Sequence, residues 1–113
     1  MSALSVLRAA AGAALLVNAV PHGVAGVQGR PFPTPFADPP GVGLSAPGVN
    51  VAWSTANAVA GALLMARGIR TPAEWVGAGI AASGMAFILA FHFGDVMRGG
   101  KGLRGIRSRL PGS

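Results

Sequence analysis

The residues of this 113-residue chain that could do chemistry are two histidines and three carboxylates, and there is no cysteine. Thiol catalysis, disulfides and thiolate metal sites are therefore excluded. His92 and Asp95 are three residues apart and share one face of a helix. Asn18 and His22 are four apart and do the same. Two histidines on facing helices could ligate haem iron, bind a metal with Asp95 as third ligand or orienting group, carry protons, or contact a quinone.

Polar or small residues also recur at i, i+4, i+7 and i+11 on one helical stripe: Asn50, Ser54, Asn57 and Gly61. In lipid such a stripe should face other helices. The simpler interpretation of His22 and His92 is therefore that they hydrogen-bond across helices and hold a bundle together. The more specific interpretation is that both histidines bind one cofactor, with haem as the candidate. Either interpretation predicts one polar intramembrane cluster, made of Asn18, His22, Asn50, Ser54, Asn57, His92 and Asp95.

No enzyme-type constellation accompanies these residues. Asp38 lies among prolines, and Glu74 is placed to close a helix capping box. The sequence contains no paired carboxylates, no phosphate-cradling loop and no HExxH motif. We therefore expect a protein that is not an enzyme.

The elements that must position these residues are three stretches without Asp, Glu, Lys or Arg, at residues 9–29, 49–66 and 75–94. Each is about long enough to cross the ~30 Å hydrocarbon core at ~1.5 Å per residue. The chain is 51% hydrophobic and 11% charged, whereas soluble domains carry about 25% charged residues. We predict an all-α integral membrane protein whose transmembrane domain spans about residues 1–97, with three helices at about 5–27, 46–66 and 72–96.

The first helix has an alternative interpretation as a cleaved signal peptide, with Arg8 before an apolar core and small residues around Ala19 or Ala25. Only one basic residue precedes that core, and neither site fits the A-x-A pattern. We expect a retained membrane helix, with the long side chain of Arg8 reaching the headgroups.

The segments between the helices carry clear local signals. Prolines at alternating positions of the loop at residues 28–48 favour extended polyproline II structure. Ser45 is the predicted N-cap of the second helix. Gly68 can end that helix in the left-handed conformation. Thr71 to Glu74 has the pattern of a capping box, so helices two and three are predicted to form a tight hairpin.

The tail at residues 98–113 is basic and has no acidic residue. It is predicted to be flexible or to form an amphipathic helix on an anionic membrane surface. Nucleic-acid binding is the competing interpretation, and the absence of interleaved aromatic residues argues against it. The predicted surface contacts are Arg98, Lys101, Arg104, Arg107 and Arg109.

Charge also predicts the orientation. With three crossings, Arg8 and two arginines of the 67–74 turn lie on one side, and Arg30 and the five basic tail residues lie on the other. The positive-inside rule then places the loop and the C-terminus in the cytoplasm. The many Arg, Ala, Gly and Pro residues indicate a GC-rich, bacterial genome, and hence a multi-pass protein of the bacterial inner membrane.

We therefore expect a small non-catalytic membrane protein that serves as an accessory, assembly or scaffolding component of a larger complex. Its predicted partners are the bilayer, anionic headgroups at the tail, and other membrane proteins or further copies of itself, packed on small-residue faces. The alternatives are a transport or pore-forming protein and a haem- or quinone-associated anchor using His22 and His92. The layout of three crossings and a basic tail resembles that of a class of phage holins, without a shared motif.

Overall fold

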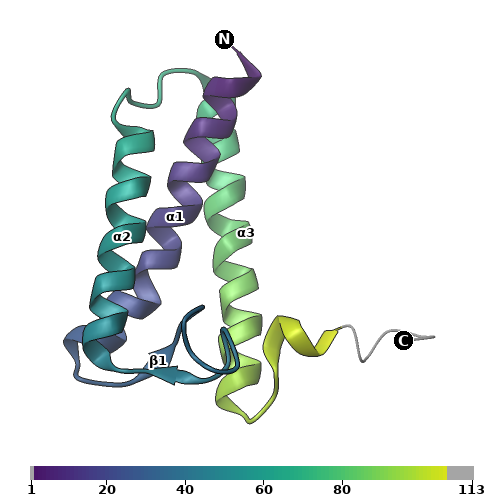
Figure 1. Ribbon diagram of the computed structural model, residues 1–113. Coiled ribbons are helices and arrows are strands. Elements are labelled where there is room, and N and C mark those ends of the chain that lie inside the picture. The colour runs from purple at the N-terminus through teal and green to yellow at the C-terminus, as the bar shows by residue number, and fades with distance from the viewer. Residues whose placement is uncertain (1, 107–113) are drawn as a thin grey trace.

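The computed structural model describes residues 2–106, and these form a mostly helical fold (Figure 1). The helical boundaries lie within two residues of those predicted from the sequence. The elements in chain order are α1 (Ala3–Val27), β1 (Phe32–Pro33), β2 (Leu44–Ser45), α2 (Pro47–Met65), α3 (Pro72–Met97) and the short 3-10 helix η1 (Gly102–Gly105).

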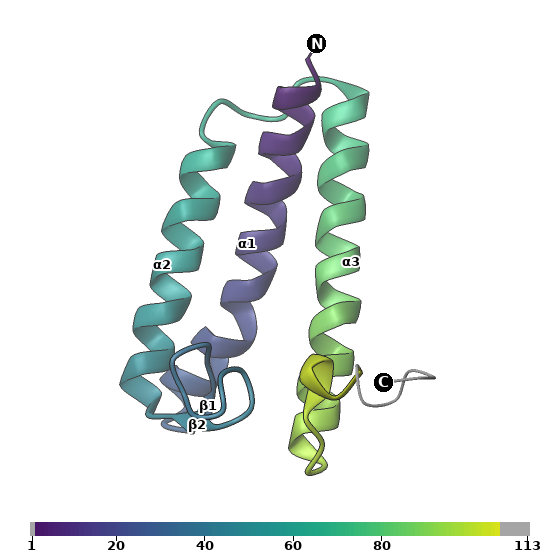
Figure 2. The same cartoon turned by 45° about the vertical axis from the view of Figure 1, so that its right-hand side comes forward.

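The three helices stand side by side in one layer, with α1 between α2 and α3 in both views (Figures 1 and 2). The principal dimensions of 44 × 40 × 17 Å express this flat shape. α1 packs extensively on both neighbours, whereas α2 and α3 share little surface. The N-terminus and the α2–α3 turn lie at one end of the layer, and the proline-rich loop and η1 lie at the other.

Local signals explain where the helices begin and end. The hydroxyl of Thr71 accepts from the backbone N–H of Glu74, and the carboxylate of Glu74 accepts from the N–H of Thr71, so the predicted capping box is confirmed. Gly68 has a φ of 81°, a conformation that glycine adopts without strain. The predicted N-cap Ser45 is wrong, because Ala46 holds that position and makes no side-chain cap bond. Pro21 does not end α1, which continues to Val27.

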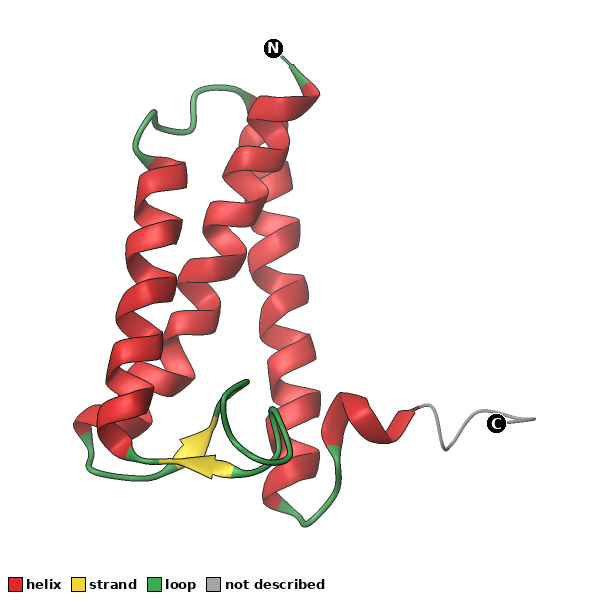
Figure 3. Ribbon diagram, in the orientation of Figure 1, coloured by secondary structure: helices red, strands yellow, loops and turns green. Residues whose placement is uncertain are grey.

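The proline-rich loop folds back on itself, whereas the sequence predicted an extended loop and an all-α fold. β1 and β2 pair antiparallel, with Phe32 opposite Ser45, so the described residues are not purely α-helical (Figure 3). Between the strands the carbonyl of Thr34 accepts from Ala37 and Gly41, and these turns replace a continuous extended segment. The hydroxyls of Thr34 and Ser45 lie 2.5 Å apart, which explains why Ser45 serves the loop and does not cap α2.

Glycines let α1 and α2 approach closely. A Cβ atom on Gly61 would lie 2.9 Å from the carbonyl oxygen of Gly12, and one on Gly26 would lie 2.9 Å from that of Pro47. Real Cβ atoms do not come so close to backbone atoms, so the two helix backbones touch at both points. Small residues that allow such contact are typical of membrane helix pairs.

Burial is arranged opposite to that of a soluble protein. Apart from Pro33 and several glycines, the buried apolar residues of the described chain are five alanines, while large side chains face outward, with Leu63 71% and Phe87 78% exposed. Among the described helices, α1 and α3 are long and apolar enough to span a membrane. Only 22% and 11% of their most apolar windows are buried, whereas the core helix of a soluble protein is mostly buried. The more polar α2 does not pass the same test.

Candidate polar site between the helices and the loop

A buried polar contact between helices joins His22 of α1 to Asn50 of α2. Asn50 is fully buried, and its amide nitrogen lies 2.9 to 3.3 Å from the carbonyl oxygens of Phe32, Ser45 and Ala46. This nitrogen is therefore the donor group, and the amide oxygen accepts from Nδ1 of His22 at 2.9 Å. Asn50 thus ties α1, the loop and the start of α2 together.

Two further contacts continue along the same pair of helices. The amide nitrogen of Asn18 donates to the amide oxygen of Asn57 at 3.0 Å. The hydroxyl of Ser54 donates to the carbonyl oxygen of Ala19 at 2.7 Å. The polar stripe of α2 therefore faces α1, as its helical spacing predicts.

His92 and Asp95 are held by a different set of partners at the end of α3. Nε2 of His92 lies 2.7 Å from the carbonyl oxygen of Gly41, and Nδ1 accepts from the backbone N–H of Leu103 at 2.9 Å. Nε2 must therefore carry the ring proton, and the imidazole is neutral. The carboxylate of Asp95 accepts from the N–H of Gly102 at 2.9 Å. Together they fasten the loop and η1 to α3.

The predicted cluster therefore splits into two hydrogen-bonded groups, which meet at an aromatic wall. The centroid of the Phe93 ring lies 5.6 Å from that of the His22 ring and 5.0 Å from that of the His92 ring, and both contacts are edge-on. Both histidines and Asn18 line one small cavity of about 140 Å³, which can hold several water molecules. Trp53 also lines it, and its buried indole N–H has no hydrogen-bond partner among the described residues.

The geometry limits what this site can ligate. Ligation of haem iron or a metal by His92 would require it to give up one of its two backbone bonds. Within residues 2–106 no three His, Asp or Glu side chains gather into a metal-binding group. The arrangement supports a structural role in which neutral polar groups satisfy one another between the helices.

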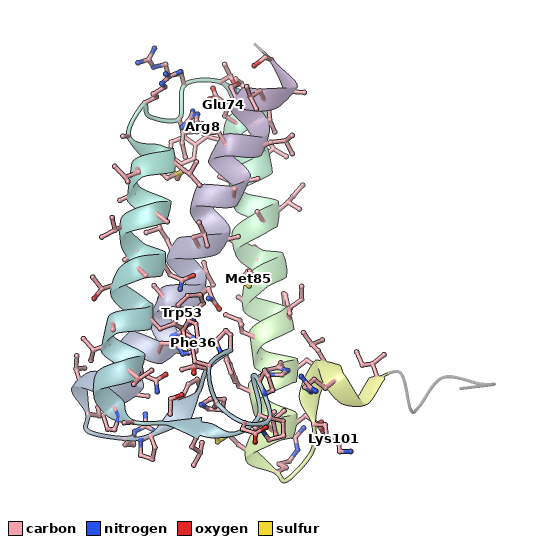
Figure 4. All side chains as sticks on the ribbon, viewed as in Figure 1. Arg8, Phe36, Trp53, Glu74, Met85 and Lys101 are labelled. Carbon is pink, nitrogen blue, oxygen red and sulfur yellow. The ribbon has the colours of Figure 1, made fainter. Side chains whose placement is uncertain are left out.

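The loop closes the cluster on one side. The ring of Phe36 meets that of Trp53 edge-on with centroids 5.0 Å apart, and the two lie in front of α1, between α2 and α3 (Figure 4). The ring of Phe32 lies 5.5 Å from His22. The aromatic residues of the loop therefore lie over the helices and shield the histidine from the surroundings.

A second polar site, at the opposite end, was not predicted from the sequence. The guanidinium of Arg8 forms an ion pair with Glu74 at 3.0 Å and donates to the carbonyl oxygens of Leu64 and Gly68 (Figure 4). The side chains of the pair are 18% and 6% exposed, so Arg8 does not extend to the headgroups as predicted. The sequence contained a signal for this ion pair, because the predicted three-helix arrangement places Arg8 and Glu74 at the same end of the bundle.

The basic residues of the tail are described only in part. Arg98 is the C-cap of α3, and the side chains of Arg98, Lys101 and Arg104 are exposed. Of the predicted amphipathic helix, the described residues form η1, a single 3-10 turn. Arg107 and Arg109 lie outside the described residues.

No protein-family model and no curated protein matches this sequence, and no solved structure matches this fold.

Proposed function

We propose that this protein is a small, non-catalytic integral membrane protein that acts as an accessory, assembly or scaffolding component of a larger membrane complex. The observation that carries the proposal is its inverted burial, with alanines and hydrogen-bonded polar groups inside and Leu, Ile, Phe and Val outside. Such a surface is unfavourable in water and suits hydrocarbon, where buried polar groups must find partners within the protein.

The proposal includes α2 as a third crossing. α2 lies alongside α1 (Figure 1), and its 19 residues cover a rise of about 28 Å, close to the thickness of the hydrocarbon core. Its asparagines and Ser54 face α1, and its outer side carries Val59 and Leu63, which are 52% and 71% exposed. A low average hydropathy therefore reflects polar groups that lipid would not meet.

The accessory role follows from the free surface of α3. Ala78 of α3 is buried, and a Cβ atom on Gly77 would meet Val6 of α1 at 2.8 Å. By contrast, Cβ atoms on Gly79 and Gly84 would meet nothing within 4 Å. Together with the exposed aromatic rings nearby, these open glycines offer a surface on which another membrane protein or a second copy can pack closely.

For orientation we propose that the loop and tail end face the cytoplasm of a bacterial cell. Arg30, Arg98, Lys101 and Arg104 are exposed at that end. This charge distribution matches the cytoplasmic side of inner-membrane proteins.

Two measurements test the proposal. The untagged protein is expected to stay with the membranes through a sodium carbonate wash, and recovery in the supernatant would overturn the proposed membrane location.

In the second measurement, a photo-crosslinking residue is placed at Phe87 on α3 or, as a matched control, at exposed Val59 on α2. We expect a protein adduct of one discrete mass from position 87 and lipid adducts alone from position 59. Dye leakage on induction would indicate a pore instead, and a Soret band lost in His22→Ala would indicate a haem anchor.

A further inference from the structure

A groove of about 510 Å³ runs between α1 and α3. Its walls are apolar and come from Val20 and Val24 of α1, Ala86 and Ala90 of α3, and the ring of Phe93. The groove is open to the surroundings because α2 packs on another side of α1. In a membrane this space cannot stay empty, so hydrocarbon must fill it.

One end of the groove is charged. Arg30 lines it and is the only charged residue among its lining residues. The guanidinium donates to the side-chain oxygen of Gln28 at 2.8 Å, which is a neutral partner. No described carboxylate lies within ion-pair distance of Arg30, since the ion pair of the described residues is the one at Arg8. Arg30 therefore presents an uncompensated positive charge at the mouth of an apolar channel.

The dimensions suit a lipid tail. Arg30 follows the end of α1 by three residues, so it lies at the membrane boundary in the proposed arrangement. The α1 residues of the groove, from Val17 to Val24, cover a rise of about 10 Å, within the roughly 15 Å of one leaflet. A chain lying along the groove would place its headgroup beside the guanidinium.

We propose that this groove binds one phospholipid with an anionic headgroup, whose acyl chain lies between α1 and α3 and whose phosphate pairs with Arg30. The proposal rests on the membrane location proposed above. Apolar contacts cannot select among lipids with equal tails, because bulk lipid offers the same contacts. Selection must come from the charge at Arg30, and one basic residue near the headgroups corresponds to about a fivefold preference.

The test uses the full-length protein in detergent, with native mass spectrometry of phosphatidylglycerol and phosphatidylcholine that carry identical acyl chains. We expect the first bound phosphatidylglycerol to be favoured about fivefold over phosphatidylcholine. Arg30→Gln is expected to abolish that preference, while the matched variant Arg67→Gln, at the opposite end, keeps it. Equal binding of the two lipids, or an undiminished preference in Arg30→Gln, overturns the proposal.

Further variants distinguish a lipid held in the groove from one held by the basic tail. Ala90→Trp fills the groove from an exposed position and is expected to remove one bound lipid, whereas Ala62→Trp on the exposed side of α2 removes none. If Lys101→Gln abolishes the preference and Arg30→Gln does not, the tail holds the lipid and the groove proposal fails. A protein found in the membrane fraction without lipid preference contradicts only this inference, whereas a protein in the supernatant contradicts the proposed function itself.

Discussion

At the scale of single residues, the buried polar side chains of residues 2–106, apart from the indole N–H of Trp53, have hydrogen-bond partners of defined chemistry. Asn50 donates to three carbonyl groups and accepts from His22, and His92 joins two backbone segments. Each contact removes a polar group from an environment that cannot solvate it. Hydrogen bonding across helices, the simpler of the two interpretations of the histidines, describes the contact of His22 with Asn50, whereas His92 bonds the loop and η1.

The amide of Asn50 provides the first test at this scale. Asn50→Asp keeps the size of the side chain but turns the donor into an acceptor that faces three carbonyl oxygens. We expect the free energy of unfolding to fall by about 1–3 kcal/mol, because unsatisfied buried groups and repulsion between oxygens replace the hydrogen bonds. Reversible unfolding in mixed micelles, followed by circular dichroism, measures the change.

A control lies one turn further along α2. Thr55 is exposed and bonds only to the carbonyl of Val51 in its own helix. Thr55→Ala should therefore change the unfolding free energy by less than about 0.5 kcal/mol. An equal effect of the two substitutions would show that the site at Asn50 does not hold the helices together.

At the scale of elements, the contact of α1 with α2 depends on the absence of side chains. Gly12 and Gly61 bring the two backbones together, and the polar bonds of Asn18 and Ser54 lie along the same contact. Without a hydrophobic driving force in lipid, close packing and such bonds supply the association energy. The separation of α2 from α3 leaves α1 as the element on which both depend.

Two glycine substitutions separate the effect of close helix packing on stability from the effect of helix propensity. Gly61→Ala would place a Cβ atom 2.9 Å from the carbonyl oxygen of Gly12, whereas Gly79→Ala would meet nothing within 4 Å. We expect Gly61→Ala to destabilise by about 1–3 kcal/mol. We expect Gly79→Ala to be neutral or to stabilise by up to about 1 kcal/mol, since alanine is the better helix former. The same micelle unfolding measurement compares them, and equal effects would contradict a close contact of α1 with α2 at Gly61.

At the scale of the whole molecule, each end of the layer is closed by one side-chain cluster. Arg8 and Glu74 join the start of α1 to the α2–α3 turn. His92 joins the proline-rich loop and η1 to α3 at the other end. The chain therefore alternates between two ends, which is the arrangement that three crossings of a membrane require.

The lack of cysteine in the chain makes this topology directly measurable. Single cysteines at exposed Ser2 and Arg70 are expected to react with a membrane-impermeant maleimide from one side, and cysteines at exposed Asp38 and Lys101 from the other. Labelling of intact cells should reach Ser2→Cys and Arg70→Cys, because the positive-inside rule places them outside. If Arg70→Cys and Asp38→Cys react from the same side, α2 does not cross.

Much of the fold could be predicted because its signals are local. Hydropathy, proline and glycine positions and the capping box at Thr71 located the three helices, and the stripe on α2 predicted which side of that helix faces its neighbour. These features depend on residues within a few turns of one another. The prediction that Ser45 caps α2 failed because a distant residue, Thr34, competes for its hydroxyl.

The sequence by itself determined the three long helices and the apolar character of their outer surfaces. Only the tertiary structure decided that α1 lies in the middle, that Arg8 turns inward to Glu74, and that His92 binds the loop and η1 rather than His22. The reason is that these pairings depend on how each helix is rotated about its axis and on the path of the connecting loop. Contacts between residues far apart in the chain determine both the helix rotation and the path of the loop.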